Sequence, residues 1–556
     1  MYIKVTNVSG KKYIQLVQSY REGTKVKQKV ISNLGRIDVL SQLGLIELLP
    51  KIESLLSGKE PKKQDKSGYD ISTLKEISRL NYGYIAYKKL WDSYSLSRIL
   101  DRIAQRKKIG YNLSETVFQL VVNRLLTPSS KLHHYQTKAQ YIFTEAQEGL
   151  HNIYRGLSIL SENKNEIEEY IFEKNKNLFN MQTDIVFYDV TTYHYESQKS
   201  DEIRDFGFSK ANKINEVQVV MGLIIDKEGR PIGYEIFSGS TTDVKTMLPI
   251  LKKLKKQFNL DQVIIVADKG MNSKENLAKI KEAGYNYIVS TRIRSMGKQM
   301  QERILDKQGY KNKLEGKEEG YSYKVLDYKN IIKTCEGKIV EIDEKMVCSY
   351  SPKRANKDRK DRERGIEKAA KCVEGNNTSS MINKRGYRKY LKLDEGNNSK
   401  KSSLSLDKKK IEDDSLFDGY YAIEYSKLDM TAEEVINQYH QLYKIEESFR
   451  VLKSTFNTRP IYVWTEEHIQ GHFIICFFAF LLQRALEVRL KKEYSAERIK
   501  EALLSMEVSQ IEVDGEQFYL RSNHDKLAST IFKNLRINLP PNILPQKKMI
   551  EYISEI

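Results

Sequence analysis

Two aspartates in the sequence each follow a short apolar stretch. Asp189 comes after IVFY at Ile185–Tyr188, and Asp268 comes after VIIVA at Val263–Ala267, with Gly270 suited to a turn. Short apolar runs predict buried strands, in which aspartate is uncommon because its carboxylate is costly to bury. A turn or helix-cap role is the plainer explanation. A carboxylate held on a rigid element to bind a metal is the alternative.

A pair of strand-end carboxylates has a defined chemistry. If the two strands lie side by side, the carboxylates repel each other unless one is protonated or a cation lies between them. Divalent Mg²⁺ and Mn²⁺ prefer carboxylate oxygens and also bind substrate phosphates. Asp189 and Asp268 therefore predict a metal-dependent site that acts on phosphate esters.

A third carboxylate is expected from segment 431–454, which is predicted to form one long helix opened by a Thr431–Glu434 capping box. Four side chains of this helix share one face: Tyr439, Glu446, Arg450 and Lys453. The stripe alone is weak support, since Glu–Arg pairs are common on exposed helices. Beside the two aspartates, Glu446 completes an Asp–Asp–Glu set. Its neighbour Glu447 is the main alternative, and it points about 100° away around the helix.

The segment 184–296 alternates between strand and helix patterns, which predicts a mixed α/β sheet. Strands are expected at 185–190, 215–226, 233–239, 262–267 and 285–292. Helices are expected at 241–258, with Asp243 as the N-cap, and at 273–284. This sheet and the helix at 431–454 are the elements that must position the three acids.

The rest of the chain divides by composition. The expected segments are a β-meander at 1–55, a polar linker at 56–69, a helical domain at 70–180 that either supports the fold or binds DNA, a first core part at 184–296, a basic insertion at 297–415, a second core part at 416–490 and a C-terminal segment at 491–556. The apolar run 473–482 is about half the ~20 residues that span a bilayer, so it predicts a buried helix and no membrane partner. The N-terminus lacks a signal-peptide pattern, and the four cysteines form no disulfide framework, which favours the cytoplasm.

The net charge of +19 over 556 residues indicates an anionic binding partner and says little about the fold. Nucleic acid is the first candidate and an anionic membrane surface is the second. Basic residues crowd the insertion, including Lys353, Arg354, Lys357 and Arg359, and Lys210 follows the first strand. We expect these residues to contact DNA phosphates; the alternative is a solvated charged face.

Several stretches resemble bacterial insertion-sequence transposases of the DDE type with the YREK signature, Y-x2-R-x3-E-x6-K. They include FYDVTTYHYES, VADKGM and IEESFRVLKSTFNTRPIYVW, and the likeness extends over most of the chain. Tyr439, Glu446 and Lys453 match the signature, whereas Leu442 stands where the family usually has Arg. Arg450 offers a cation from the same face.

The resemblance implies an RNase H-like core in which Asp189, Asp268 and Glu446 hold two Mg²⁺ ions, with Mn²⁺ as a substitute. It implies cleavage at terminal inverted repeats and transfer of the freed 3′-OH to target DNA, a cut-and-paste reaction. Tyr439, Arg450 and Lys453 would contact phosphate. The alternatives are a metal-dependent nuclease of the same fold and a catalytically silent DNA-binding protein.

The resemblance also implies that two protomers pair the two DNA ends as a homodimer, acting at the nucleoid in the cytoplasm. The C-terminal segment carries apolar residues that could form the contact between protomers: Leu503, Leu504, Ile531 and Phe532. The alternative is that these side chains pack within their own domain.

Overall fold

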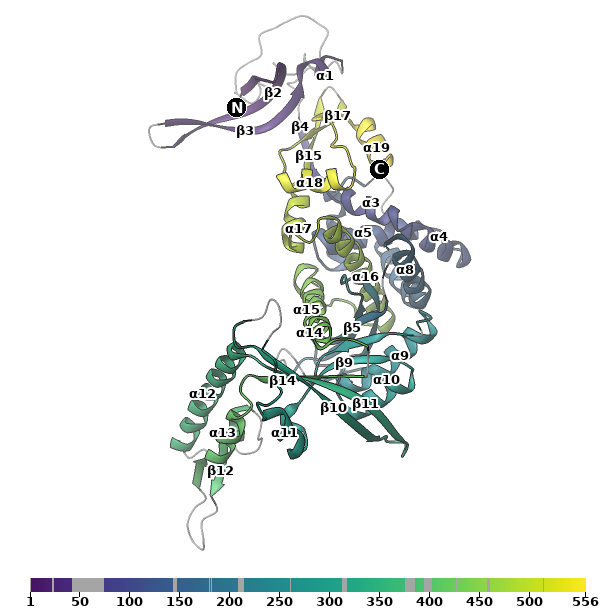
Figure 1. The fold of residues 1–556 in the computed structure, drawn as a ribbon. Coiled ribbons are helices and arrows are strands. Elements are labelled where there is room, and N and C mark those ends of the chain that lie inside the picture. Colours follow the sequence, from purple (N-terminus) through teal and green to yellow (C-terminus); the bar gives the residue numbers. More distant parts are fainter. Residues whose placement is uncertain are drawn as a thin grey trace, which may run out of the picture.

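The structure is a computed structural model of the chain. It describes residues 2–22, 25–42, 75–143, 148–179, 181, 183–208, 215–260, 262–312, 318–375, 386–394, 403–426, 429–457, 461–513 and 515–556. The linker expected at 56–69 lies outside these residues. The molecule is elongated: a small N-terminal sheet lies at one end, and the segment that carries helix α12 projects at the other (Figure 1).

An eight-stranded mixed sheet forms the core, in the order β10-β11-β14-β9-β8-β5-β6-β7. Strands β5, β6 and β7 are antiparallel neighbours, while β8 and β9 run parallel to β5. The mixed α/β architecture of an RNase H-like core is therefore confirmed. The strands are β5 (Ile185–His194), β6 (Gln218–Ile225), β7 (Pro231–Ser238), β8 (Ile264–Ala267), β9 (Asn286–Thr291), β10 (Ser322–Lys333), β11 (Ile339–Tyr350) and β14 (Tyr420–Ser426).

Helices cover both faces of this sheet. Every residue of β6 is buried, as expected for an apolar strand with packing on two sides. Alternate residues of β5 point to opposite faces: Phe187 belongs to the apolar cluster that includes α16 (Glu466–Arg489), whereas Tyr188 belongs to the cluster with α9 (Met247–Lys256) and α10 (Lys274–Glu282). Asp189 therefore faces the same side as Phe187.

The long hairpin of β10 and β11 extends the sheet, although both strands fall within the 297–415 segment expected to be a separate insertion. Helix α11 (Lys298–Leu305) precedes this hairpin. The part that projects from the core lies between β11 and β14 (Figure 1) and has its own small apolar cluster. Its elements are α12 (Pro352–Glu374), η7 (Gly386–Tyr390), β12 (Leu391–Asp394), β13 (Ser403–Leu406) and α13 (Lys408–Ser415).

The buried helix predicted for the run 473–482 is confirmed as part of α16. By length and composition α16 could cross a membrane, but 94% of its most apolar window is buried inside the described structure, as in the core helix of many proteins. It packs among helices of the 70–180 segment: α3 (Ile85–Ser93), α4 (Leu96–Arg106), α5 (Leu113–Leu126), α6 (Lys131–Thr137), α7 (Leu150–Glu162) and α8 (Lys164–Phe179).

The C-terminal segment forms a second sheet, in which β4 (Lys75–Asn81) pairs with β15 (Glu507–Val513). The apolar residues proposed as a contact between protomers do not form a free surface, since Leu503, Ile531 and Phe532 are buried in the chain's own core. That expectation is wrong, and packing within the domain explains them. The other elements are α17 (Ala496–Leu504), β16 (Glu516–Arg521), α18 (Lys526–Asn534), β17 (Ile543–Pro545) and α19 (Gln546–Ser554).

The predicted N-terminal meander is present as β1 (Tyr2–Val8), β2 (Lys11–Glu22) and β3 (Lys25–Arg36), followed by α1 (Ile37–Gln42). Its apolar side chains Ile14 and Leu34 pack with Phe518 of the C-terminal sheet. The Ser32 hydroxyl also donates a 2.9 Å hydrogen bond to the carbonyl of Arg521.

Candidate active site

Asp189 and Asp268 are placed by two adjacent parallel strands. The register of β5 and β8 ends with Tyr188 opposite Ala267, so the two aspartates are the next residues on neighbouring strands. Asp268 directly follows β8, as predicted. Asp189 does not end its strand, because β6 continues to pair with β5 as far as His194.

The turn after β8 shapes the surroundings of Asp268. The Gly270 N–H donates a 2.8 Å hydrogen bond to Oδ1 of Asp268, as the Val190 N–H does over 2.7 Å to Oδ1 of Asp189. A Cβ at Gly270 would stand 2.9 Å from Oδ1 of Asp268 and 3.4 Å from Oδ2 of Asp243. The carboxylate of Asp243 therefore approaches that of Asp268.

The expectation that Asp243 caps a helix is wrong. It is the first residue of the 3₁₀ turn η4 (Asp243–Thr246), whose N-cap is Thr242 and which has no side-chain capping bond. This turn precedes α9, and the Tyr188 hydroxyl anchors it by a 2.7 Å hydrogen bond to Oγ1 of Thr246. Asp243 is thus an acid near the site, although its place in the sequence predicted a structural role.

The single helix expected at 431–454 is divided in the structure. It consists of α14 (Ala432–His440), α15 (Tyr443–Arg450) and a π-helical turn, η8 (Val451–Thr455). The predicted Thr431–Glu434 capping box is confirmed. At the break, Leu442 N–H bonds to the carbonyl of Tyr439 and Lys444 N–H to that of Gln441, three residues back in each case, which tightens the backbone.

The division changes how the four predicted side chains lie. Glu446 and Arg450 are exposed on α15, which packs against β5. Lys453, in the π turn, donates a hydrogen bond to Oγ1 of Thr191, two residues beyond Asp189 on the same face of β5. The structure therefore brings the helix with Glu446 and Lys453 to the strand with Asp189.

Tyr439 lies on α14, apart from the other three. Burial raises the pKa of its hydroxyl, a hydrogen bond with Ser290 lowers that pKa, and the nearby charge of Asp268 raises it. Tyr439 is thus close to the second aspartate, whereas Lys453 is beside the strand of the first.

Glu447, the alternative to Glu446, is half-buried and has a buried partner. Its carboxylate pairs with Arg484 of α16 over 3.2 Å, and Arg484 also pairs with Glu487. Glu447 therefore has a structural partner, while Glu446 is exposed on the neighbouring face of α15. Leu442, at the position where the family signature has Arg, is buried in the apolar core.

Within the described ranges, no three His, Cys, Asp or Glu side chains gather closely enough to hold one metal ion. The donor chemistry nevertheless suits a divalent cation, because Asp189 and Asp268 follow paired residues of neighbouring strands and offer hard carboxylate oxygens. The third acid, Glu446, is on a helix that packs against the same strand.

A cleft of about 720 Å³ lies between the core and the projecting segment. Lys269, which follows Asp268, lines it from the core, and Arg354 lines it from α12. The sequence patterns did not point to the other lining cations, although Arg292 ends the strand predicted at 285–292 and Arg294 follows it: Arg292, Arg294, Arg362 and Lys389. The other predicted DNA contacts in α12 are exposed, namely Lys353, Lys357 and Arg359. Lys210 lies outside the described residues.

The family model for the transposase DDE domain matches residues 180–482, more than half of the chain, including all three acids. The chain belongs to this family. A second model, the N-terminal domain of IS1634 family transposases, matches residues 3–67. The protein is therefore a DDE transposase of the insertion-sequence type, an enzyme of a family that acts on DNA with divalent metal ions.

One solved structure that resembles this transposase is a cryo-EM structure of the piggyBac transposase synaptic complex with hairpin DNA. It shares 12% sequence identity over 85% of this chain and 84% of that chain, with a TM-score of 0.36. No match was found among curated proteins.

Proposed function

We propose that Asp189, Asp268 and Glu446 are the catalytic acids of this transposase and hold two Mg²⁺ ions, for which Mn²⁺ can substitute. The observation that carries the proposal is the placement of the two aspartates after paired residues of adjacent parallel strands, within the matched DDE domain. Glu446 is favoured as the third acid because α15 packs on β5 and Glu447 is already paired with Arg484.

The reaction proposed is cut-and-paste transposition. The enzyme cleaves DNA at the terminal inverted repeats of an insertion sequence and joins the freed 3′-OH to target DNA. Divalent ions bound by the acids would supply positive charge to the attacking and leaving oxygens of the phosphodiester. A nuclease that only cleaves is the nearest alternative, whereas a silent DNA-binding protein has no need of three such acids.

The cations and Tyr439 position the DNA rather than act as acids. Lys453, held at Thr191 beside the strand of Asp189, would bind the phosphate as a point charge. Arg450 is exposed at the end of α15, and Tyr439 lies near Asp268. Further phosphate contacts are proposed for residues of the basic insertion and the first core part: Lys353, Arg354, Lys357, Arg359 and Lys210.

Two copies of the enzyme are proposed to act together as a homodimer in the paired-end complex, at the nucleoid. The net charge of +19 makes protomers repel each other until DNA phosphates neutralise them. The proposed domains are an N-terminal meander at 1–55, a helical domain at 70–180 that supports the fold or contacts DNA, a core at 184–296 and 416–490, a basic insertion at 297–415 and a C-terminal segment at 491–556. Strands β10 and β11 of the 297–415 segment belong to the core sheet, so only the part between β11 and β14 is set apart from the core.

The test is incubation of the full-length protein with Mg²⁺ and DNA that carries both inverted repeats. The wild type should release the element and join it to a target plasmid, while Asp189→Asn and Asp268→Asn should do neither yet still bind the DNA. Cleavage without joining would indicate the nuclease alternative. Near wild-type cleavage by either variant would remove that aspartate from the site.

A further inference from the structure

Helix α12 carries its basic residues on two different faces. One face holds six of them at intervals of four, three, four, four and three residues: Lys353, Lys357, Lys360, Arg364, Lys368 and Lys371. At 3.6 residues per turn they fall within about 80° of the helix circumference. All six are exposed. We call this set the α12 stripe; it runs for about 27 Å at 1.5 Å per residue.

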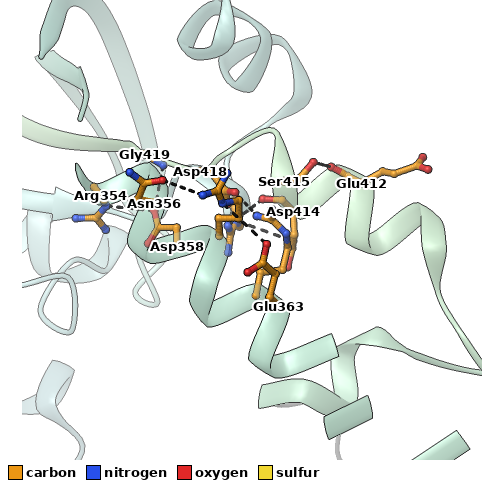
Figure 2. Close-up of polar contacts among 12 residues, drawn as sticks. Arg354, Asn356, Asp358, Glu363, Glu412, Asp414, Ser415, Asp418 and Gly419 are labelled. Carbon is orange, nitrogen blue, oxygen red and sulfur yellow. Dashed lines mark hydrogen bonds and ion pairs between the residues drawn. The ribbon is translucent and has the colours of Figure 1, made fainter. Parts of the chain in front are cut away.

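The other face of α12 holds the helix in place (Figure 2). Arg362 pairs with Asp418, and Asp358 accepts a 3.1 Å hydrogen bond from the Gly419 N–H. Close to these contacts, a Cβ at Gly365 would stand 3.3 Å from the ring of Tyr390, and Ala369 is buried. This face is therefore occupied by the rest of the projecting segment, which leaves the α12 stripe directed outwards.

The stripe has little internal charge compensation. Among the residues that the structure describes, none of its five lysines forms an ion pair with a carboxylate. Arg364 lies 3.6 Å from Asp361, but both side chains are more than half exposed, and exposed pairs of this kind contribute little. Like charges four residues apart on a helix destabilise it. An anionic partner would relieve that repulsion.

The stripe begins beside the proposed catalytic region. Arg354, next to Lys353, lies over the Tyr421 ring at 5.1 Å and lines the cleft that Lys269 enters from the core. Its charge also partly offsets the rise that burial causes in the pKa of Tyr439, the residue near Asp268. From this first turn, α12 runs away from the core towards the far end of the molecule (Figure 1).

We propose that the α12 stripe binds the sugar-phosphate backbone of duplex DNA as the duplex leaves the catalytic region. The inference rests on the proposed function and adds to it the surface that holds the duplex. Duplex DNA presents one phosphate charge per ~1.7 Å of axis, so a stripe of about 27 Å faces many phosphates. Lysines are point charges without the fixed fork that reads base edges, so the contact is independent of sequence.

The test compares two triple variants of the full-length protein. The stripe variant is Lys353→Gln, Lys357→Gln and Lys360→Gln. The control variant removes the same number of charges at exposed lysines of the 297–415 segment that lie outside α12: Lys333→Gln, Lys408→Gln and Lys409→Gln. Binding is measured by fluorescence anisotropy in EDTA, over a range of salt, with a duplex that carries an inverted repeat and a scrambled duplex of equal length.

Each lost phosphate contact lowers the slope of log K against log salt by about 0.9, so the stripe variant should lose up to ~2.7. The control should change the slope by much less. If the slope falls on both duplexes, the stripe binds duplex DNA in general, including target DNA. If the slope falls only on the inverted-repeat duplex, the stripe binds the end of the element. An unchanged slope on both, or an equal loss in the control, would overturn the proposal.

Two further measurements keep the result interpretable. The stripe variant should melt at the wild-type temperature or higher, because the substitutions remove like-charge repulsion. Asp268→Asn should bind with the wild-type slope and fail to cleave end DNA when Mg²⁺ is added. Cleavage by Asp268→Asn would reject the proposed catalytic acids without altering the slope comparison.

Discussion

The carboxylates of Asp243 and Asp268 both lie next to Gly270, where a Cβ would stand 3.4 Å from Oδ2 of the first and 2.9 Å from Oδ1 of the second. The same glycine donates its N–H to Asp268. The absence of a side chain at position 270 thus allows the turn to hold Asp268 close to a second acid.

Substitution of Gly270 should therefore impair catalysis. In Gly270→Ala the new methyl group must displace the Asp268 carboxylate, and misplacement of a reacting group by about 1 Å can cost ~100-fold in rate. We expect cleavage to fall at least ~10-fold with DNA binding retained. Gly110→Ala is the matched control, because nothing lies within 4 Å of a Cβ there. Equal cleavage by both variants would show that the turn tolerates a side chain.

Substitution of the two neighbouring glutamates of α15 should have different effects on cleavage and on stability. Glu446→Gln is expected to lower cleavage by at least ~100-fold through loss of a metal ligand. Glu447→Gln weakens an ion pair with Arg484 and should lower the melting temperature while leaving cleavage close to wild type. Single-turnover gel assays measure the cleavage rate of each variant, and melting curves measure its stability. The reverse pattern would assign the catalytic role to Glu447.

Loss of Lys453 should reduce the cleavage rate more than loss of its hydrogen-bond partner, the Thr191 hydroxyl. Lys453→Met removes a charge placed beside the strand of Asp189 and should reduce cleavage by ~10- to 100-fold. Thr191→Val removes only the hydroxyl that accepts from Lys453 and leaves the charge in place, so it should reduce cleavage by less than Lys453→Met does. If Thr191→Val is as damaging as Lys453→Met, the lysine acts mainly in packing.

Assembly can be tested by mixing wild type with Asp189→Asn on DNA that carries both ends. If each protomer cuts one end, cleavage at both ends should fall with the square of the wild-type fraction. A linear fall would mean that a single protomer cuts both ends, and the paired-protomer proposal would then fail. The total protein concentration is held constant so that end pairing does not change.

A buried lysine in the helical domain predicts a pH effect on stability. Burial, with the nearby charge of Arg124, lowers the pKa of Lys131 to about 7 from 10.5. Its Nζ lies 3.1 Å from Nδ1 of His472, which in turn faces Cys476. The folded chain releases this proton above about pH 7, while the unfolded chain keeps it up to about 10.5. Burial of the charged lysine therefore lowers the free energy of unfolding by its full amount below pH 7. This destabilisation decreases as the pH rises and is gone near pH 10.5.

Lys131→Met should consequently raise the free energy of unfolding by more than ~1 kcal/mol at pH 6.5 and by less at pH 9.5. Denaturant titrations at the two pH values measure the difference. His133→Gln, on the exposed side of the same helix, is the control. A gain that is equal at both pH values would mean that Lys131 is not the titrating group.

Local patterns predicted the elements that depend on neighbouring residues. The apolar run before Asp268, the Thr431–Glu434 capping box and the buried helix at 473–482 are all present, because each is specified within a few residues. The mixed sheet followed from the alternation of these elements.

The errors arose where distant contacts decide the structure. β5 continues past Asp189 because β6, about 30 residues later in the chain, keeps pairing with it. The helix breaks at Leu442, which is buried in the core although the helical pattern runs through it. Asp243 has the residue type of a cap, and only the tertiary position of the 3₁₀ turn places it near Asp268.

The pairing of β4 with β15 has a consequence for synthesis. The Ser78 hydroxyl bonds to the Gln510 side chain across 432 residues of sequence. Among the described residues, strand 75–81 has only an isolated bridge, from Asn81 to Tyr141, until β15 is made. A nascent chain on the ribosome cannot complete this sheet until residue 513 has left the exit tunnel. Strand β4 is therefore not paired with β15 for most of the time that the chain is being synthesised. A chain that terminates early keeps an exposed strand edge, and such edges are prone to aggregation.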